Sequence, residues 1–273
     1  MRALWHLAAG EAKSLEAAAQ AQLPQLDFNA HARLQSLIER RKNGTPLAHL
    51  TGRQRFMGID MLAGPQALIP RVETELLGYA ALRVLDTMPT SRPLKVLDLC
   101  TGSGNVALAI AKHNGDAEIF ASDLSADAIS FAQCNAKHLG LEGRVDWRIG
   151  DLLAPFPLAQ FRSQFDLITC NPPYISSPKL ASMPSEIAAH EPELAFNGGP
   201  LGIRILQRLI REAGSYLAPD GALAFEVGHG QGPAVLRRLD SLAAFSQTTS
   251  VPDASGEIRV IIARARAAAI NNQ

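Results

Sequence analysis

The tetrapeptide Asn171-Pro172-Pro173-Tyr174 combines hydrogen-bond acceptors with an aromatic face, and it follows the apolar run 165–170, which is typical of a buried strand. Two prolines cannot continue the ladder of that strand, so their carbonyl groups stay free to accept hydrogen bonds from a ligand. Asn171 adds a side-chain carbonyl, and Tyr174 adds a flat ring. This combination suits a planar guest that bears an NH2 group, either an amide or an exocyclic amine. The alternative is a rigid turn with a purely structural role.

A second candidate site is the glycine-rich turn 101–105, which connects the apolar run 94–100 to a helical pattern. Glycines let the backbone approach a ligand closely, and the N-terminus of the following helix presents free N–H groups. The next expected strand ends at Asp123, nineteen residues after Gly104. At that position a carboxylate can bind both hydroxyls of a ribose.

Two cofactors compete for this turn. Residues 102–107 satisfy the G-x-G-x-x-G/A form of a dinucleotide site, which would suit a nicotinamide cofactor. Asp98, Asp123 and the Asn-Pro-Pro-Tyr turn together favour S-adenosylmethionine, because a dehydrogenase has no evident use for that turn. The sequence therefore predicts an S-adenosylmethionine site.

Both turns need strands that end at one edge of a sheet. From residue 94 onward, strand and helix patterns alternate along the chain, which is typical of an α/β fold with a parallel sheet and helices on both faces. The expected strands are 94–100, 118–122, 145–149, 165–170, 222–228 and 257–263. The expected helices are 74–86, 104–113, 125–138, 203–217 and 231–239. The last strand follows residues 252–256 without a clear helix, which favours a terminal hairpin with one antiparallel strand.

The two motifs together resemble a known family. Residues 98–104 (Asp-Leu-Cys-Thr-Gly-Ser-Gly) and 171–175 (Asn-Pro-Pro-Tyr-Ile) are similar to motifs of the protein-(glutamine-N5) methyltransferases. Residues 40–52, 68–75 and 191–199 resemble the release-factor branch of that family, so the resemblance covers nearly the whole chain. It implies an α/β, Rossmann-like S-adenosylmethionine-dependent methyltransferase sheet with a small N-terminal helical domain.

The resemblance also implies a reaction and a partner. The enzyme would methylate the side-chain amide nitrogen of a protein glutamine, in the Gly-Gly-Gln motif of class-1 peptide release factors. Asn171 and the Pro172 carbonyl would accept the two N–H bonds of the amide, and Tyr174 would pack against its plane. These three residues are the expected catalytic group, and Pro173 joins them in binding the substrate. No general base is assigned, since the nitrogen becomes acidic as it is alkylated.

The expected cofactor site surrounds the glycine-rich turn. Residues 100–104 would wrap the methionine moiety, Asp123 would bind the ribose, Asp151 the adenine amine, and Leu152 would cover the ring. Asp151 has the alternative role of a helix N-cap. The expected cofactor-binding residues are Cys100, Thr101, Gly102, Ser103, Gly104, Asp123, Asp151, Leu152 and Asn171.

The chain departs from the family pattern at two motif positions, and the segment before Arg40 also looks short for a complete N-terminal domain of the family. Val72 stands where the family usually has proline, and residues 200–203 stand where it usually has an acid followed by Gly-Leu. These departures prompt an alternative in which a branch of the family methylates an amide or ring nitrogen of a small molecule. A sister branch that acts on a ribosomal protein, a DNA adenine methyltransferase and a cofactor-binding module without turnover are further alternatives.

Several residues keep two interpretations. Arg71 and Glu73 fit either a place beside the cofactor or a surface loop, and Phe56 fits either a substrate tunnel or core packing. Glu226 is a charge on an apolar strand with no assigned role. The segment 190–193 contains His and Glu residues without the spacing of a metal site, so no metal is expected.

The composition argues against a nucleic-acid-binding protein and against a membrane-spanning one. The 273 residues include 26 lysines and arginines against 26 aspartates and glutamates, a balance that argues against a nucleic-acid surface. No apolar stretch approaches the roughly 20 residues of a membrane span. The cysteines at 100, 134 and 170 show no metal spacing, which is typical of reduced thiols in a cytoplasmic protein.

The chain divides into two expected domains. Residues 1–65 read as a helical substrate-recognition domain that ends in a hairpin-like connector, and residues 66–273 form the methyltransferase domain. Leu34, Leu37 and Ile38 share one helical face, with Asn29 as a plausible N-cap. The tail from about residue 264 is expected to fray.

Overall fold

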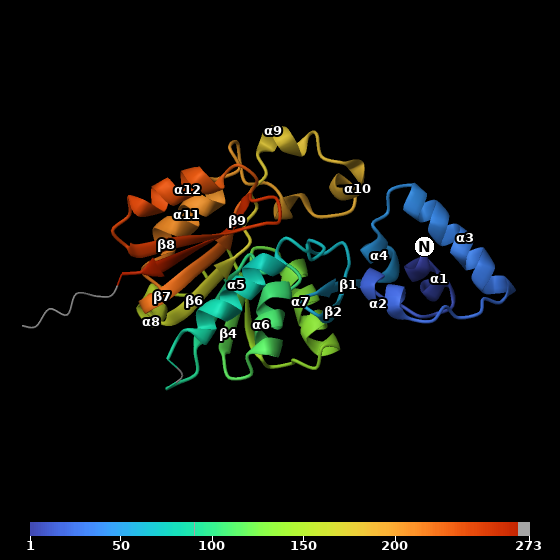
Figure 1. The fold of residues 1–273 in the computed structure, drawn as a ribbon, viewed down its shortest axis with the longest axis horizontal. Helices are drawn as coiled ribbons and strands as arrows, with labels where there is room; N and C mark the ends of the chain where they lie inside the picture. The colour runs from blue at the N-terminus through green and yellow to red at the C-terminus, as the bar shows by residue number, and fades with distance from the viewer. Residues whose placement is uncertain (90, 267–273) are drawn as a thin grey trace, which may run out of the picture.

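The computed structural model describes residues 1–89 and 91–266, and its centre is a seven-stranded sheet of order β5-β4-β3-β6-β7-β9-β8 (Figure 1). The strands are β3 (Lys95–Leu99), β4 (Glu118–Asp123), β5 (Val145–Ile149), β6 (Phe165–Cys170), β7 (Leu217–Glu226), β8 (Phe245–Pro252) and β9 (Ile258–Ala265). All pairs are parallel except those of β9, which runs antiparallel to both β7 and β8. The predicted α/β class and the single antiparallel strand are confirmed.

The sheet has helices on both faces. The helices are α5 (Glu75–Asp86), α6 (Asn105–His113), α7 (Ala126–His138), α8 (Leu158–Phe161), α11 (Arg204–Ala213) and α12 (Gly232–Asp240). Adjacent residues of β3 show why its sequence is continuously apolar: Val96 joins the core cluster under α5 and α6, while Leu97 joins the one under α11 and α12. Each fully buried side chain of this size contributes roughly 1.5–3 kcal/mol to the free energy of unfolding.

The structure differs from the sequence prediction in the helix expected over 203–217 and in two strands. The helix α11 ends at Ala213, and Leu217 already belongs to β7. The strand β7 begins at Leu217, not at residue 222, because the Pro-Asp-Gly sequence 219–221 lies within an irregular strand, with Asp220 at φ 60°. These residue types usually mark a turn, which explains the late predicted start. The strand β8 was not predicted, because its side chains are mostly polar and exposed on the sheet edge. Residues 267–273 of the predicted frayed tail lie outside the described residues.

The N-terminal helices form a unit with its own small core. They are α1 (Arg2–Ala8), α2 (Leu15–Gln20), α3 (Phe28–Lys42) and α4 (Leu47–Thr51). Leu4, Leu34 and Leu50 are buried together in this core. The N-cap of α3 is Asp27, whose Oδ1 accepts from Ala30 N at 2.6 Å, and the predicted cap Asn29 lies inside the helix.

A small antiparallel hairpin connects this unit to the sheet domain. It consists of β1 (Arg53–Phe56) and β2 (Ile59–Leu62), and it packs against the main core. Phe56 is fully buried there, which agrees with the packing interpretation of this residue. The Met57 side chain of the hairpin lies directly against Gly78 of α5, since a Cβ added there would lie 2.1 Å from Met57 Sδ.

A long segment between β6 and α11 covers the carboxyl edge of the sheet. It contains α9 (Ser177–Leu180), α10 (Ser185–Ala188) and the short helix η1 (Glu193–Ala195). Figure 1 shows this segment extending from the sheet domain toward α3. Arg41 Nη1 donates to Glu186 Oε1 at 2.6 Å, and this ion pair joins the helical unit to the segment.

Candidate active site

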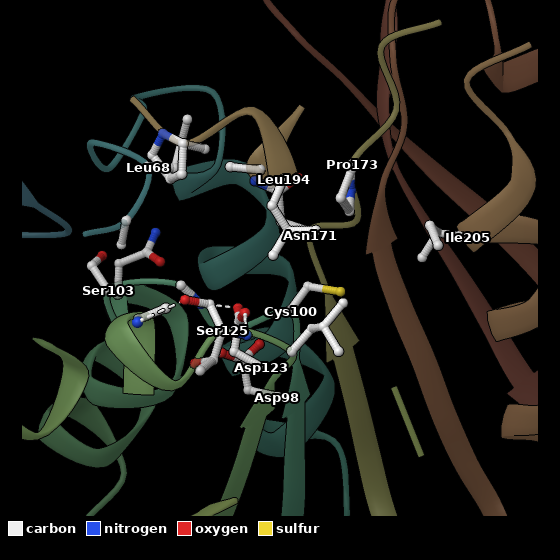
Figure 2. A pocket seen from close by; sticks show the side chains of 18 of the residues that line it. Leu68, Asp98, Cys100, Ser103, Asp123, Ser125, Asn171, Pro173, Leu194 and Ile205 are labelled. Atoms are coloured by element: carbon white, nitrogen blue, oxygen red, sulfur yellow. Dashed lines mark hydrogen bonds between the residues drawn. The ribbon is translucent and has the colours of Figure 1, made fainter. Parts of the chain in front are cut away.

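A pocket opens at the carboxyl ends of β3, β4 and β6, where the strand order changes direction between β3 and β6. Figure 2 shows side chains from the glycine-rich turn, the end of β4 and the Asn-Pro-Pro-Tyr turn around this one cavity. The residues predicted from the sequence that line it are Cys100, Thr101, Gly102, Ser103, Asp123, Asp151, Leu152, Asn171 and Pro173. Gly104, Pro172 and Tyr174 do not line it.

The glycine-rich turn owes its shape to left-handed backbone. Gly102 has φ 55° and lines the pocket, and a Cβ added there would meet no protein atom within 4 Å. Gly104 has φ 80° at the N-cap of α6, and a Cβ there would lie 2.9 Å from Trp147 Cη2. The first glycine therefore leaves open space for a ligand, and the second lets α6 pack closely.

Asp98 supports the turn from below. Its carboxylate accepts from Thr101 Oγ1 at 2.6 Å and from Thr169 Oγ1 at 2.7 Å, and the residue is only 2% exposed. Burial raises the pKa of Asp98 to about 6, although the two hydroxyl donors oppose that change. The side chain thus links the turn after β3 to β6, the strand that carries the second motif.

Asp123 ends β4 and faces the same pocket. Its Oδ2 accepts from Gly102 N at 2.9 Å, and its Oδ1 accepts from Ser125 N at 2.9 Å. Burial raises the pKa of this carboxyl above its usual value despite these backbone donors. Each carboxylate oxygen keeps a lone pair for further acceptance, so the group is suited to hydroxyls of a ligand.

Asp151 has a partner that the sequence analysis missed. Its Oδ2 forms an ion pair with Arg208 Nη1 at 2.8 Å, and both residues line the pocket. The Asp151 carbonyl, and not its carboxylate, accepts from Ala154 N. One signal was available: Arg204 and Arg208 lie one turn apart on α11, so both can face the same side. Leu152, at φ 50°, is buried beside them.

The Asn-Pro-Pro-Tyr turn presents its residues in different directions. Asn171 lines the pocket, and its Nδ2 donates to Thr74 Oγ1 at 3.1 Å. Tyr174 turns toward the sheet, where its hydroxyl donates to Glu226 Oε1 at 2.9 Å. Tyr174 therefore does not line this pocket, and its packing on a bound amide stays a prediction.

Glu226 accepts hydrogen bonds from several side chains behind the Asn-Pro-Pro-Tyr turn. Only 1% of its side chain is exposed, and it accepts from Thr74 Oγ1 at 2.8 Å and from Arg259 Nη2 at 3.3 Å. Burial raises the pKa of Glu226, while Thr74, Tyr174 and Arg259 act against that rise. Burial is also the main reason that the pKa of Tyr174 is raised.

Glu191 connects the covering segment to the pocket rim. It forms an ion pair with Arg71 and accepts from Ile69 N at 2.8 Å, and its side chain is 1% exposed. Arg71 lines the pocket, whereas Glu73 is exposed outside it. Within residues 1–89 and 91–266, no group of three His, Cys, Asp or Glu side chains is arranged to hold a metal ion.

Comparison with known proteins defines the class first. Residues 91–249 match the family model described as a methyltransferase domain. The catalytic domain of hMettl16, solved with an RNA hairpin, shares the fold with a TM-score of 0.57 at 13% identity, over 92% of this chain and 85% of that chain. The fold is therefore that of a Rossmann-like methyltransferase.

Sequence relatives then define the family. The release factor glutamine methyltransferase of Moorella thermoacetica is 38% identical over 87% of this chain and 81% of its own length. That of Koribacter versatilis is 35% identical over 88% of this chain and 82% of its own length. The chain belongs to the release factor glutamine methyltransferase family, and it is an enzyme of the methyltransferase class. The family and the enzyme class predicted from the two motifs are confirmed.

One further expectation concerns membranes. Among the helices that the structure describes, none has both the length and the apolar character needed to span a bilayer.

Proposed function

We propose that this enzyme transfers a methyl group from S-adenosylmethionine to the side-chain nitrogen of the glutamine in the Gly-Gly-Gln motif of class-1 peptide release factors. The observation that carries the proposal is the presence of Asn171 in the same pocket as the glycine-rich turn. One pocket thus contains both a hydrogen-bond acceptor for an amide NH2 and a binding site for a nucleoside. Release factors act in translation, so the proposed location is the cytoplasm, and no membrane or nucleic-acid partner is proposed.

The donor set of the pocket fits S-adenosylmethionine. The open space at Gly102 gives room for the methionine moiety, and the Asp123 carboxylate has the chemistry to accept from ribose hydroxyls. Asp151 offers an acceptor for an adenine amine, with the Leu152 side chain beside it. When bound, the sulfonium supplies an electrophilic methyl group.

The residues of the turn orient the nucleophile. Asn171 Nδ2 donates one of its two hydrogens to Thr74, and Oδ1 can accept one N–H of the glutamine amide. Within the described residues the Pro172 carbonyl accepts no hydrogen bond, so it is available for the second N–H. Both acceptors also stabilise the positive charge that grows on nitrogen as the new bond forms. The N–C bond forms as the S–CH3 bond breaks, so S-adenosylhomocysteine is the leaving product. The alkylated nitrogen then gives its proton to solvent water, and no protein base is assigned.

The departures from the family pattern favour a protein substrate over a small molecule. Val72 is 71% exposed and Leu201 is 75% exposed, and neither lines the pocket. Changes at these positions therefore leave the cavity wall unchanged. They place apolar side chains on the outer surface, where a protein can contact them.

We further propose that residues 1–65 recognise the release factor. The support is the separate core of α1–α4 and the ion pair of Arg41 with Glu186, which places the helical unit against the segment covering the pocket. A chain that lacks residues 1–51 should then bind S-adenosylhomocysteine and fail to methylate the protein. Full methylation by the truncated chain would assign the helices another role.

The function is tested with the full-length chain, radiolabelled S-adenosylmethionine and a purified class-1 release factor. We expect label in the release factor, and none in a matched factor in which the motif glutamine is replaced by asparagine. The shorter side chain keeps the amide but withdraws it from the methyl group by one CH2. Equal labelling of both factors, or labelling of neither, would contradict the proposal.

A further inference from the structure

A hydrogen-bond chain with a fixed direction runs behind the pocket to Asn171. It starts at Arg259, passes through the carboxylate of Glu226 and the hydroxyl of Thr74, and ends at the Asn171 amide. Glu226 and Thr74 are each 1% exposed, so water does not replace these partners. Tyr174 donates to the same carboxylate from the other side.

The direction follows from the donors that each group owns. An ionised carboxylate has no hydrogen to donate, and all three side-chain partners of Glu226 are hydrogen-bond donors: Thr74, Tyr174 and Arg259. The single hydroxyl hydrogen of Thr74 is therefore directed to Glu226. The Thr74 oxygen can then only accept from Asn171, and it selects Nδ2 over Oδ1.

The direction of the hydrogen-bond chain determines which end of the Asn171 amide faces the pocket. With Nδ2 held at Thr74, the carbonyl oxygen of Asn171 lies at the other end of the amide, where it can face the substrate. The opposite orientation of the amide would present N–H groups to the NH2 of a substrate amide, and two donors repel each other. We infer that Glu226 is a positioning residue, which acts through Thr74 to hold Asn171 with its carbonyl toward the substrate. This inference rests on the proposed function, since it assumes a substrate that donates.

Burial raises the pKa of Glu226, and its three donors, Thr74, Tyr174 and Arg259, oppose that rise because they stabilise the ionised carboxylate. If Glu226 carried a proton on Oε2, Thr74 would be free to turn its hydrogen toward Asn171 Oδ1. The ionised carboxylate of Glu226, which can only accept hydrogen bonds, is therefore the form that fixes the orientation of the Asn171 amide. Arg259, whose side chain is 13% exposed, places a positive charge beside the ionised carboxylate.

The test uses three variants of the full-length chain. Thr74→Val keeps the volume and removes the hydroxyl, Thr74→Ser keeps the hydroxyl, and Glu226→Gln gives the chain a group that can donate to Thr74. We expect Thr74→Val and Glu226→Gln to lower kcat with the release factor by about tenfold or more. KM and the Kd of S-adenosylhomocysteine should stay within about threefold, and Thr74→Ser should recover most of kcat.

A measurement that needs no turnover tests the positioning of Asn171 independently of the proposed substrate. In the full-length protein without substrate, hydrogen exchange of the Asn171 side-chain amide is followed by nitrogen-15 NMR. We expect slow exchange of one amide hydrogen in the wild type and in Thr74→Ser, and faster exchange in Thr74→Val. If that pattern holds but the release factor is not methylated, the proposed substrate is wrong and the positioning of Asn171 stands.

Three results would overturn the inference. The first is an unchanged kcat in Thr74→Val. The second is a Thr74→Ser variant as impaired as Thr74→Val, and the third is equal exchange of the Asn171 amide in all three proteins. An unchanged kcat in a folded Glu226→Gln variant would likewise overturn the role of Glu226. If that variant fails to fold, the Thr74 pair still tests whether Thr74 holds the Asn171 amide.

Discussion

Asn171 Nδ2 donates to Thr74 Oγ1 at 3.1 Å, although the two residues are 97 positions apart in the chain. Thr74 stands at the start of α5, and Asn171 follows β6. The loop before the first helix of the sheet domain therefore fixes the side chain that faces the proposed substrate. The chemistry assigned to the Asn-Pro-Pro-Tyr turn depends on a residue outside that motif.

Replacement of Asn171 should impair turnover more than cofactor binding. Asn171→Ala removes an acceptor that acts on the substrate amide and on the developing charge, at a cost on the order of 3 kcal/mol in the transition state. We expect kcat to fall by about a hundredfold, with the Kd of S-adenosylhomocysteine within about tenfold. Steady-state kinetics and calorimetric titration measure the two quantities. A near-normal kcat would mean that the turn is only structural.

Replacement of Asp123 should impair cofactor binding. Asp123→Ala removes a buried carboxylate that lines the pocket, and the loss of charge-assisted hydrogen bonds should weaken S-adenosylhomocysteine binding by roughly 1–3 kcal/mol. Asp127→Ala, on the first turn of α7 and outside the pocket, is the matched control and should bind normally. Binding of NADH with no response to S-adenosylhomocysteine would support the dinucleotide alternative instead.

The buried carboxyl of Asp98 should make stability depend on pH. Burial raises its pKa to about 6 from 3.8, so the native state binds more protons than the unfolded state between about pH 4 and pH 6. The contribution of Asp98 to the free energy of unfolding therefore falls as pH rises through that window. Asp98→Asn lacks this titration.

The comparison is made by denaturant unfolding of both proteins without cofactor. Between about pH 4 and pH 7, the stability of Asp98→Asn relative to the wild type should improve by up to roughly 3 kcal/mol. A difference that is independent of pH would show that Asp98 titrates alike in the folded and unfolded chains.

Gly202 should be needed for the shape of the Asn-Pro-Pro-Tyr turn. It has φ 71°, and a Cβ there would lie 2.3 Å from the carbonyl oxygen of Tyr174. Gly140 has a similar φ of 67° but no atom within 4 Å of an added Cβ. We expect Gly202→Ala to lower both the melting temperature and kcat well below those of Gly140→Ala. Similar values for the two variants would indicate that only backbone strain matters.

Local patterns predicted much of the fold and part of the site. The strand, turn and helix around Gly102 and Gly104 lie within twenty residues, so their order in the chain defines their arrangement. Asp123 was predicted because the ends of parallel strands meet at one sheet edge. The family motifs placed Asn171 beside them.

The remainder depends on contacts between distant segments. Arg208 reaches Asp151 across 57 positions, and Arg71 reaches Glu191 across 120. No local pattern identifies such a partner. The orientation of Tyr174 was unpredictable for the same reason, since the carboxylate that holds it belongs to β7. An aromatic ring beside two prolines gives no indication of which way it turns.

The most direct test of the proposed function is the position of the transferred methyl group. The full-length enzyme is incubated with a class-1 release factor and S-adenosylmethionine that carries a deuterated methyl group, and the digested factor is sequenced by tandem mass spectrometry. We expect one deuterated methyl group on the side-chain nitrogen of the Gly-Gly-Gln glutamine, and we expect its transfer to depend on Asn171. A methyl group on another residue, or on a small molecule with none on the factor, would contradict it.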